Sequence, residues 1–313
     1  MRRLDNIDLR LLRVFLTLVD AGGFPEAQIV LNLSPSTLST HLGTLERKLG
    51  GRLCERGRGG FRLTQFGEAT YAATRQLFDD IDSFHTRLGR DQGQLVGRLR
   101  IGIVDGVVTS PELGLQKALA RFGEEADSVY IDLHLGTPQE LEQSLSDGRR
   151  DMVIGPLSQK VPGVSYVPLK SEAHSLYCGR GHPLFSMPRS QLTREAINQS
   201  AFSVRGYRHL EDLYRVDHPK ASASVIHMEA QVMLLLSGRY IGFLPRHIGD
   251  HWAERGEMRR LELSAFDFVS QHFVAVRRAE ADEPIRRRLL EILKATAARE
   301  ADRVRSGSGA EAA

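Results

Sequence analysis

The segment from Phe24 to Leu63 constrains the fold most, because two helix signals and a basic, glycine-rich stretch follow one another in it. Ser34-Pro35 is typical of a helix start, since the serine hydroxyl accepts hydrogen bonds from free N–H groups and proline suits the first helical position. A shorter helix over about 25–31 and a turn at Asn32-Leu33 precede it. Leucines at spacings of four, three and four then predict a helix with one buried face, and they are Leu38, Leu42, Leu45 and Leu49.

The opposite face of this helix carries short polar side chains, which allow close approach to base edges and phosphates. After Gly50-Gly51, two short strands over 53–54 and 61–64 flank a tip rich in glycine and arginine. Glycine lets the backbone approach a duplex, and arginine reaches phosphates or a minor groove. The succession predicts a winged helix-turn-helix with its third helix in the DNA major groove. The residues expected to contact DNA are Ser34, Pro35, Ser36, Thr37, Ser39, Thr40, His41, Arg52, Arg56, Arg58 and Arg62.

The distribution of charge agrees with this prediction. Residues 1–65 hold ten Lys and Arg against six Asp and Glu, an excess of +4, although the net charge of the whole chain is +3. Positive charge therefore gathers in the segment where phosphate contacts would require it.

Composition and cysteine usage argue against several classes of protein. No apolar run reaches the roughly 18 residues of a membrane span, and Asp5, Asp8 and Arg10 interrupt the apolar residues of the N-terminus, so no signal peptide is expected. Cys54 and Cys178 are far apart and form no Cys-x-x-Cys motif, so neither a disulfide nor a zinc site is expected. We therefore expect a cytoplasmic protein with no metal, no cofactor and no membrane partner.

A long ordered set of residues in the first part of the chain matches a family pattern. The matching residues are Phe15, Gly22, Phe24, Ala27, Leu31, Ser34, Ser36, Leu38, Ser39, Leu42, Leu45, Glu46, Leu49, Gly50, Leu53, Arg56, Leu63, Thr64 and Gly67. On these residues, 7–67 resemble the N-terminal domain of LysR-type transcriptional regulators. Gln28 and Cys54 depart from the family pattern, which usually has alanine and phenylalanine there. Both lie behind the reading face, so we expect an altered core with DNA binding retained.

A helical stretch from Gly67 to about Arg90 follows. Its apolar residues repeat at four, three and four, the a/d pattern of a paired helix, and they are Leu77, Ile81, Phe84 and Leu88. The same pattern would fit a helix packed on its own domain. Pairing of two subunits is favoured because a helix-turn-helix normally reads two symmetry-related half-sites. The resemblance also implies that this linker helix dimerises and that the family commonly assembles as tetramers.

From Gly97 onward, strands alternate with helices, which predicts an α/β region with parallel sheets and covering helices. We expect a helix over 111–122 capped by Ser110, a capping box from Thr137 to Glu140, and two separate strands over 163–169 and 175–178, the first at a sheet edge. The runs LRIGIVDG, ELEQSLSDGRRDMVIGP, GHPL and GRYIGFLPR resemble the effector-binding region of the same family. That resemblance implies the periplasmic-binding-protein fold, in which two subdomains are joined by crossing segments, here near Pro168 and 266–270, with a ligand cleft between them.

These observations divide the chain into four parts. They are a winged helix-turn-helix domain at 1–66, a linker and dimerisation helix at 67–93, an effector-binding domain at 94–302 and a disordered low-complexity tail at 303–313. Within the effector-binding domain, subdomain I is expected at about 97–168 and 270–302, and subdomain II at about 169–269.

Ligands of open α/β sheets bind beyond the carboxyl ends of strands, near helix N-termini. The effector-binding candidates at such places are Asp105, Gly106, Thr109, Ser110, Gly136, Thr137, Pro138, Gly155, Ser203, Arg205, Met228 and Glu229. Ser110 and Thr137 are equally explained as helix caps, and Arg205 as a surface residue rather than a carboxylate clamp. Asp105 beside the first helix would disfavour an anion and favour an amine or hydroxyl, or simply stabilise the helix dipole. Our hypothesis is an effector without a dominant carboxylate.

No His-Glu-x-x-His, Gly-x-Ser-x-Gly or P-loop motif is present, and the histidines are scattered, so no enzyme is expected. The alternative is a cytoplasmic small-molecule-binding protein or enzyme on the periplasmic-binding-protein-like fold, which leaves the N-terminal module unexplained. A redox role for Cys178 would need a resolving thiol. We therefore expect a sequence-specific transcriptional regulator of the LysR type. Its expected partners are double-stranded promoter DNA, a small-molecule effector, further copies of itself as homodimer or homotetramer, and, as a further candidate, RNA polymerase.

Overall fold

The computed structural model describes residues 6–57, 60–90, 94–110, 112–157 and 161–308. It separates into two compact units, Met1–Asp91 and Gln92–Ala313. Among the helices in these ranges, none is long and apolar enough to span a bilayer.

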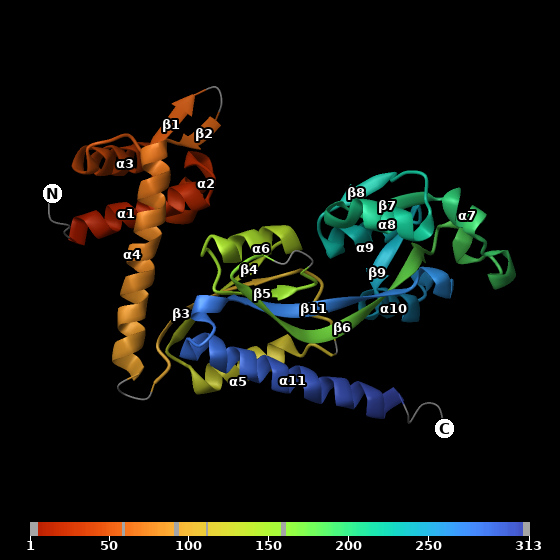
Figure 1. Cartoon of the computed structure of the whole chain (residues 1–313). Helices are drawn as coiled ribbons and strands as arrows, with labels where there is room; N and C mark the ends of the chain where they lie inside the picture. The colour runs from red at the N-terminus through yellow and green to blue at the C-terminus, as the bar shows by residue number, and fades with distance from the viewer. Residues whose placement is uncertain (1–5, 58–59, 91–93, 111, 158–160, 309–313) are drawn as a thin grey trace. The chain divides into compact units, whose positions relative to one another are not determined.

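The first unit has a three-helix core and a hairpin (Figure 1), made of α1 (Asn6–Asp20), α2 (Phe24–Leu31), α3 (Pro35–Leu49), β1 (Cys54–Gly57) and β2 (Gly60–Leu63). The predicted cap of α3 is confirmed, because the Ser34 hydroxyl accepts a hydrogen bond from the Thr37 N–H at 3.2 Å. The predicted wing is confirmed as the antiparallel pair β1–β2. Glu46 joins α3 to the wing, since its Oε1 accepts the Leu53 N–H at 2.8 Å.

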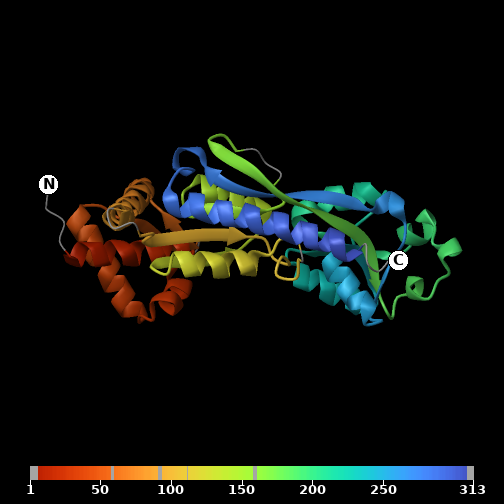
Figure 2. The same ribbon diagram turned by 90° about the horizontal axis from the view of Figure 1, so that it is seen from below.

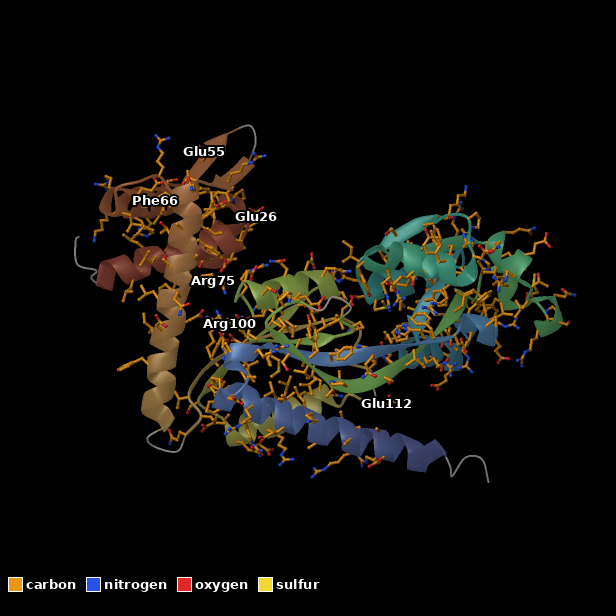
Figure 3. The ribbon with its side chains drawn as sticks, viewed as in Figure 1. Glu26, Glu55, Phe66, Arg75, Arg100 and Glu112 are labelled. Atoms are coloured by element: carbon orange, nitrogen blue, oxygen red, sulfur yellow. The ribbon has the colours of Figure 1, made fainter. Side chains whose placement is uncertain are left out.

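The long helix α4 (Gln65–Arg90) begins directly after the wing. Its residue Tyr71 packs against the core of the first unit and donates its hydroxyl hydrogen to Asp20. Arg75, on the same helix (Figure 3), donates to the Tyr71 hydroxyl at 3.1 Å. At Gly67, an added Cβ would lie 1.9 Å from the carbonyl oxygen of Leu53. The close passage of α4 past the wing therefore depends on glycine at this position.

The second unit is built on one sheet in the order β4-β3-β5-β11-β6-β9-β7-β8, with β10 paired to β6. The strands are β3 (Gly97–Ile103), β4 (Val129–Leu135), β5 (Met152–Gly155), β6 (Val164–Gly179), β7 (Ala201–Arg205), β8 (Ala223–Val225), β9 (Tyr240–Pro245), β10 (Met258–Arg260) and β11 (Phe268–Arg277). The α-helices are α5 (Leu115–Glu125), α6 (Pro138–Ser146), α7 (Arg194–Asn198), α8 (His209–Val216), α9 (Met228–Leu236), α10 (Arg246–Glu254) and α11 (Pro284–Ser308).

Hydrophobic clusters divide this sheet into two subdomains, with one cluster in subdomain I and two in subdomain II. Subdomain I gathers β3, β4 and β5 with α5, α6 and α11, and subdomain II gathers β7, β8 and β9 with α7 to α10. The strands β6 and β11 pair antiparallel and run through both halves (Figure 1), so they are the two crossing segments. Figure 2 shows α11 beside α5 along subdomain I, where Lys117 bonds Glu300 at 2.7 Å.

The structure corrects three of our secondary-structure predictions. The two strands expected over 163–169 and 175–178 are one strand, β6, and it lies at the centre of the sheet rather than at an edge. The helix expected from Pro111 begins at Leu115 instead, because Gly114 takes the left-handed conformation at its N-cap. The tail expected to be disordered from 303 is helical as far as Ser308.

We predict that Gly67→Ala destabilises the first unit by about 1–3 kcal/mol, because the new methyl group meets backbone that must shift. Gly43→Ala is the matched control: nothing lies within 4 Å of a Cβ there, and alanine is favoured over glycine in a helix by roughly 1 kcal/mol. Hydrogen–deuterium exchange in the peptides of α1 to α4 of the full chain measures both. Protection in Gly67→Ala equal to that in Gly43→Ala would contradict the prediction.

Candidate nucleic-acid interface and inter-subdomain cavity

The residues predicted to contact DNA differ in exposure. Along α3 and the wing, the exposed ones are Ser34, Pro35, Ser36, Thr40, Arg52 and Arg62, and the partly exposed ones are Thr37, Ser39 and His41. The Nε2 atom of His41 is buried without a hydrogen-bond partner among the described residues, so this edge of its ring does not lie on the open face. The side chains of Arg56 and Arg58 lie outside the described residues.

Hydroxyl groups of α3 are oriented by the helix itself. Thr40 donates its hydroxyl hydrogen to the carbonyl of Ser36 at 2.8 Å, and Thr44 donates to the carbonyl of Thr40 at 2.8 Å. A hydroxyl that donates to its own helix keeps its lone pairs for outside donors. The exposed hydroxyl of Thr40 therefore offers an acceptor, as the exocyclic amines of adenine and cytosine require.

The residues of α4 that were predicted to pair with a second subunit differ in their surroundings. Leu77 packs against the core of the first unit, as in the alternative reading of a helix on its own domain. Ile81 is partly exposed, whereas Phe84 is 57% exposed, and the side chain of Leu88 lies outside the described residues. An aromatic side chain with more than half of its surface exposed is consistent with a contact to a second subunit.

A small cavity of about 20 Å³ lies between the two subdomains. Four of its lining residues were predicted to bind effector, namely Asp105, Gly106, Arg205 and Met228. Pro156, which also lines it, directly follows the candidate Gly155 at the end of β5. The lining residues that the sequence did not indicate are Val104, Glu172, His174, Tyr207, Pro245 and His272.

The other effector-binding candidates do not line this cavity. Thr137 and Pro138 begin α6, where the predicted capping box with Glu140 is confirmed. Ser203 is buried in β7 and donates to Gln231 at 2.6 Å. The remaining ones are Gly136 after β4, Gly155 at the end of β5, Glu229 exposed in the first turn of α9, and Thr109 and Ser110 in the loop before α5.

Asp105 bridges the two subdomains. Its Oδ2 accepts the Met228 N–H at 2.6 Å and lies 3.3 Å from Nδ1 of His227. The carboxylate therefore stands at the N-terminus of α9 in subdomain II, not at that of the first helix of subdomain I as expected. Two further bonds cross the cleft: Thr109 to Nδ1 of His247 at 3.0 Å, and Gln139 Nε2 to the carbonyl of Tyr207 at 3.3 Å.

Arg205 is only 2% exposed, which corrects its interpretation as a surface residue. Its Nε and Nη2 donate to the two carboxylate oxygens of Asp212 at 3.1 and 2.6 Å. Its guanidinium also lies over the ring of Phe268 at 5.7 Å. Because Asp212 already occupies one edge of the guanidinium in a bidentate pair, Arg205 is not free to act as a two-pronged carboxylate clamp.

The carboxylate of Glu172, on β6, is the centre of a buried cluster of charged and imidazole groups. Its Oε1 lies 3.1 Å from both Lys170 Nζ and His247 Nε2. Its Oε2 lies 3.3 Å from His174 Nε2 and 3.8 Å from His272 Nε2. Burial alone would raise the pKa of Glu172, but the hydrogen bonds of His174 and His247 and the nearby Lys170 charge hold it well below its usual range.

The two cavity histidines are neutral. Burial lowers the pKa of His174 and of His272 to about 4, although Glu172 acts in the opposite direction and the Arg208 charge adds to the lowering. Ser110 belongs to the same cluster, because its buried hydroxyl accepts from Lys170. The cluster thus joins β6, β11, α10 and the loop before α5.

The sequence held one signal for these missed residues. Lys170, Glu172 and His174 alternate along the chain, so they share one face of a strand. In β11, Phe268, Ser270 and His272 alternate likewise and stand opposite them in the register. The pairing of two such distant segments could not be read from either one alone.

Cys178 is fully buried, and burial raises the pKa of its thiol to about 12. A thiol that stays protonated at neutral pH is a poor nucleophile. The structure therefore gives no support to a redox role for this residue.

We predict that acid destabilises the second unit through His174 and His272. Their folded-state pKa of about 4 lies below the ordinary 6.5, so the unfolded chain binds more protons between these values. The contribution of these histidines to the free energy of unfolding is fully present above about pH 6.5. It is lost as the pH falls toward 4, by on the order of 3 kcal/mol for each histidine. The thermal midpoint should fall between pH 7 and pH 5, with a shallower slope in the double variant His174→Gln/His272→Gln. Equal slopes would refute this.

The sequence matches two family models: the bacterial regulatory helix-turn-helix protein of the lysR family over residues 9–68, and the LysR substrate binding domain over residues 92–298. A curated relative, the HTH-type transcriptional activator BauR of Pseudomonas aeruginosa, is 33% identical over 290 residues, 92% of this chain and 95% of the relative. The HTH-type transcriptional regulator CbbR of Sinorhizobium medicae is 25% identical, over 89% of this chain and 90% of the relative.

Solved structures share the fold. Full-length CbnR complexed with its target DNA has a TM-score of 0.61 at 20% identity, covering 92% of this chain and 99% of that one. Full-length OxyR from Pseudomonas aeruginosa has a TM-score of 0.56 at 21% identity, covering 95% of both chains. With both family models matched in order along the chain, this protein belongs to the LysR-type transcriptional regulators, with a helix-turn-helix domain and an effector-binding domain.

Proposed function

We propose that this regulator acts as a homodimer, or a pair of dimers, that reads two related DNA half-sites with α3. We further propose that an effector in the inter-subdomain cavity controls this binding. The observation that carries the second part is the direct bonding of the two subdomains across the cavity by Asp105, Thr109 and Gln139. Because the target is DNA, we place the protein in the cytoplasm.

Ser36 and Thr40 are the base-contacting residues in this proposal. They are exposed one helical turn apart on α3, and the Thr40 hydroxyl keeps its acceptor capacity for a base. The exposed Arg52 and Arg62 would contact phosphates, which position the helix without reading sequence. Arg56 and Arg58 stay predictions for the tip of the wing.

Effector control follows from the size of the cavity. A volume of about 20 Å³ holds roughly one water molecule. A larger effector therefore requires the cross-cleft bonds to lengthen or break, which changes how the subdomains meet. A ligand that binds one arrangement better shifts the population toward it.

The double variant Ser36→Glu/Thr40→Glu should lose specific DNA binding, because two carboxylates on the reading face are repelled by the phosphates of the duplex. We expect affinity for a promoter site to fall at least a hundredfold in a gel-shift titration. The control is Gln116→Glu/Ala120→Glu, which places the same charges four residues apart on exposed positions of α5. If the α3 variant binds as tightly as the control, the reading face is assigned wrongly.

Phe84→Asp should weaken the subunit contact, because a charge replaces an exposed aromatic ring at the proposed interface. Sedimentation equilibrium should show a subunit dissociation constant raised at least tenfold. Ala72→Asp adds the same charge at another exposed position of α4 and should leave assembly unchanged. Unaltered assembly of Phe84→Asp would remove α4 from the proposed interface.

A further inference from the structure

We infer that the effector is a primary amine whose ammonium group enters the cavity between the subdomains and is bound by Asp105 and by the Nδ1 atoms of His174 and His272. This inference rests on the proposed function, because it names the class of ligand for the same cavity. Three features support it: the unpartnered Nδ1 atoms of the two histidines, the negative charge of Asp105 and the volume of the cavity.

The first observation is a pair of acceptors without donors. His174 and His272 are 2% and 1% exposed, both line the cavity, and the Nδ1 of each is buried with no hydrogen-bond partner among the described residues. The Nε2 atom of His174 lies 3.3 Å from Glu172 Oε2 and 3.0 Å from the Ser270 hydroxyl, and that of His272 lies 3.8 Å from Glu172 Oε2. Because a carboxylate only accepts, we place the ring proton of each histidine on Nε2. A pKa near 4 keeps the second nitrogen unprotonated at neutral pH. Each Nδ1 is therefore a buried lone pair that a ligand N–H would satisfy, and leaving it unsatisfied costs free energy.

The second observation is the charge of Asp105. Its Oδ2 is engaged by Met228 and His227, whereas its Oδ1 makes no hydrogen bond within the described part of the chain. An ammonium group has three donors and a positive charge, which matches one carboxylate oxygen and two imidazole nitrogens. Among the neighbouring cations, Arg205 is paired with Asp212, Lys170 with Glu172 and Arg208 with Glu211, although the Nη1 atom of Arg208 is buried with no partner among the described residues.

The third observation is the volume. About 20 Å³ accommodates a group the size of a water molecule. A terminal ammonium has a single heavy atom and is of that size, whereas a carboxylate has three heavy atoms and carries the wrong charge for Asp105 and Glu172. The rest of the ligand would lie in the cleft as the cross-cleft bonds give way.

Isothermal titration of the full-length protein with matched pairs of small molecules tests the inference. The probes are ω-amino alcohols of two to six carbon atoms, each paired with the diol of the same length, and 4-aminobutyrate paired with 4-hydroxybutyrate. We expect at least one amine to bind, and its hydroxyl partner to bind at least tenfold more weakly. If no amine binds, or if amines and hydroxyl partners bind equally, the inference is overturned.

Variants locate the ammonium group. Asp105→Asn removes the charge but keeps an oxygen that can accept the Met228 N–H, and it should weaken amine binding at least tenfold. Glu229→Gln, the same change at an exposed neighbour of Met228, should not. His272→Gln is the second cavity variant and should also weaken binding. Amine binding that survives both cavity variants overturns the inference and the proposed cavity together. A carboxylate or neutral probe that binds, with affinity reduced only by His272→Gln, overturns the amine class and leaves the proposed function standing.

Discussion

The buried carboxylate of Glu172 joins the two crossing strands of the second unit to α10. Glu172 lies on one crossing strand, pairs in register with Ser270 on the other, and is bonded by His247 at the start of α10. A buried charge is tolerated only when it is paired and hydrogen-bonded. Lys170 and the imidazoles of three histidines surround Glu172 and meet that condition. Both crossing strands and α10 therefore contact the same carboxylate.

Glu172, His174 and His272 of this cluster also line the cavity. His174 and His272 use Nε2 toward Glu172 and leave Nδ1 unused, so a ligand that engages them acts on groups that also stabilise the crossing strands. Thr109, on subdomain I, is linked to the cluster through His247 of subdomain II. We therefore propose that occupancy of the cavity and the arrangement of the subdomains are coupled through these direct contacts, as a ligand-controlled regulator requires.

Local signals in the sequence were sufficient for local structure. The Ser34 cap, the wing hairpin and the Thr137–Glu140 capping box depend on residues a few positions apart, and all three were predicted. The cavity was predicted only in part, because Glu172 and His272 meet through pairing of strands about a hundred residues apart in sequence. Asp105 lines the inter-subdomain cavity but stands at a different helix from the one expected, because its partner Met228 is distant in sequence. The start of α5 was missed because the left-handed Gly114 overrides the Ser-Pro signal before it.

We expect the Glu172 cluster to hold the two subdomains in one arrangement, because it links both crossing strands to α10. Electron–electron double resonance between spin labels at Val108 and Ile226 measures this directly, since these exposed residues lie on different subdomains (72% and 56% exposed) and the native cysteines are buried. We expect one narrow distance distribution for the otherwise unchanged chain and a broader distribution for Glu172→Gln, which keeps the shape of the side chain and loses its charge. Identical narrow distributions for the two proteins would contradict this expectation.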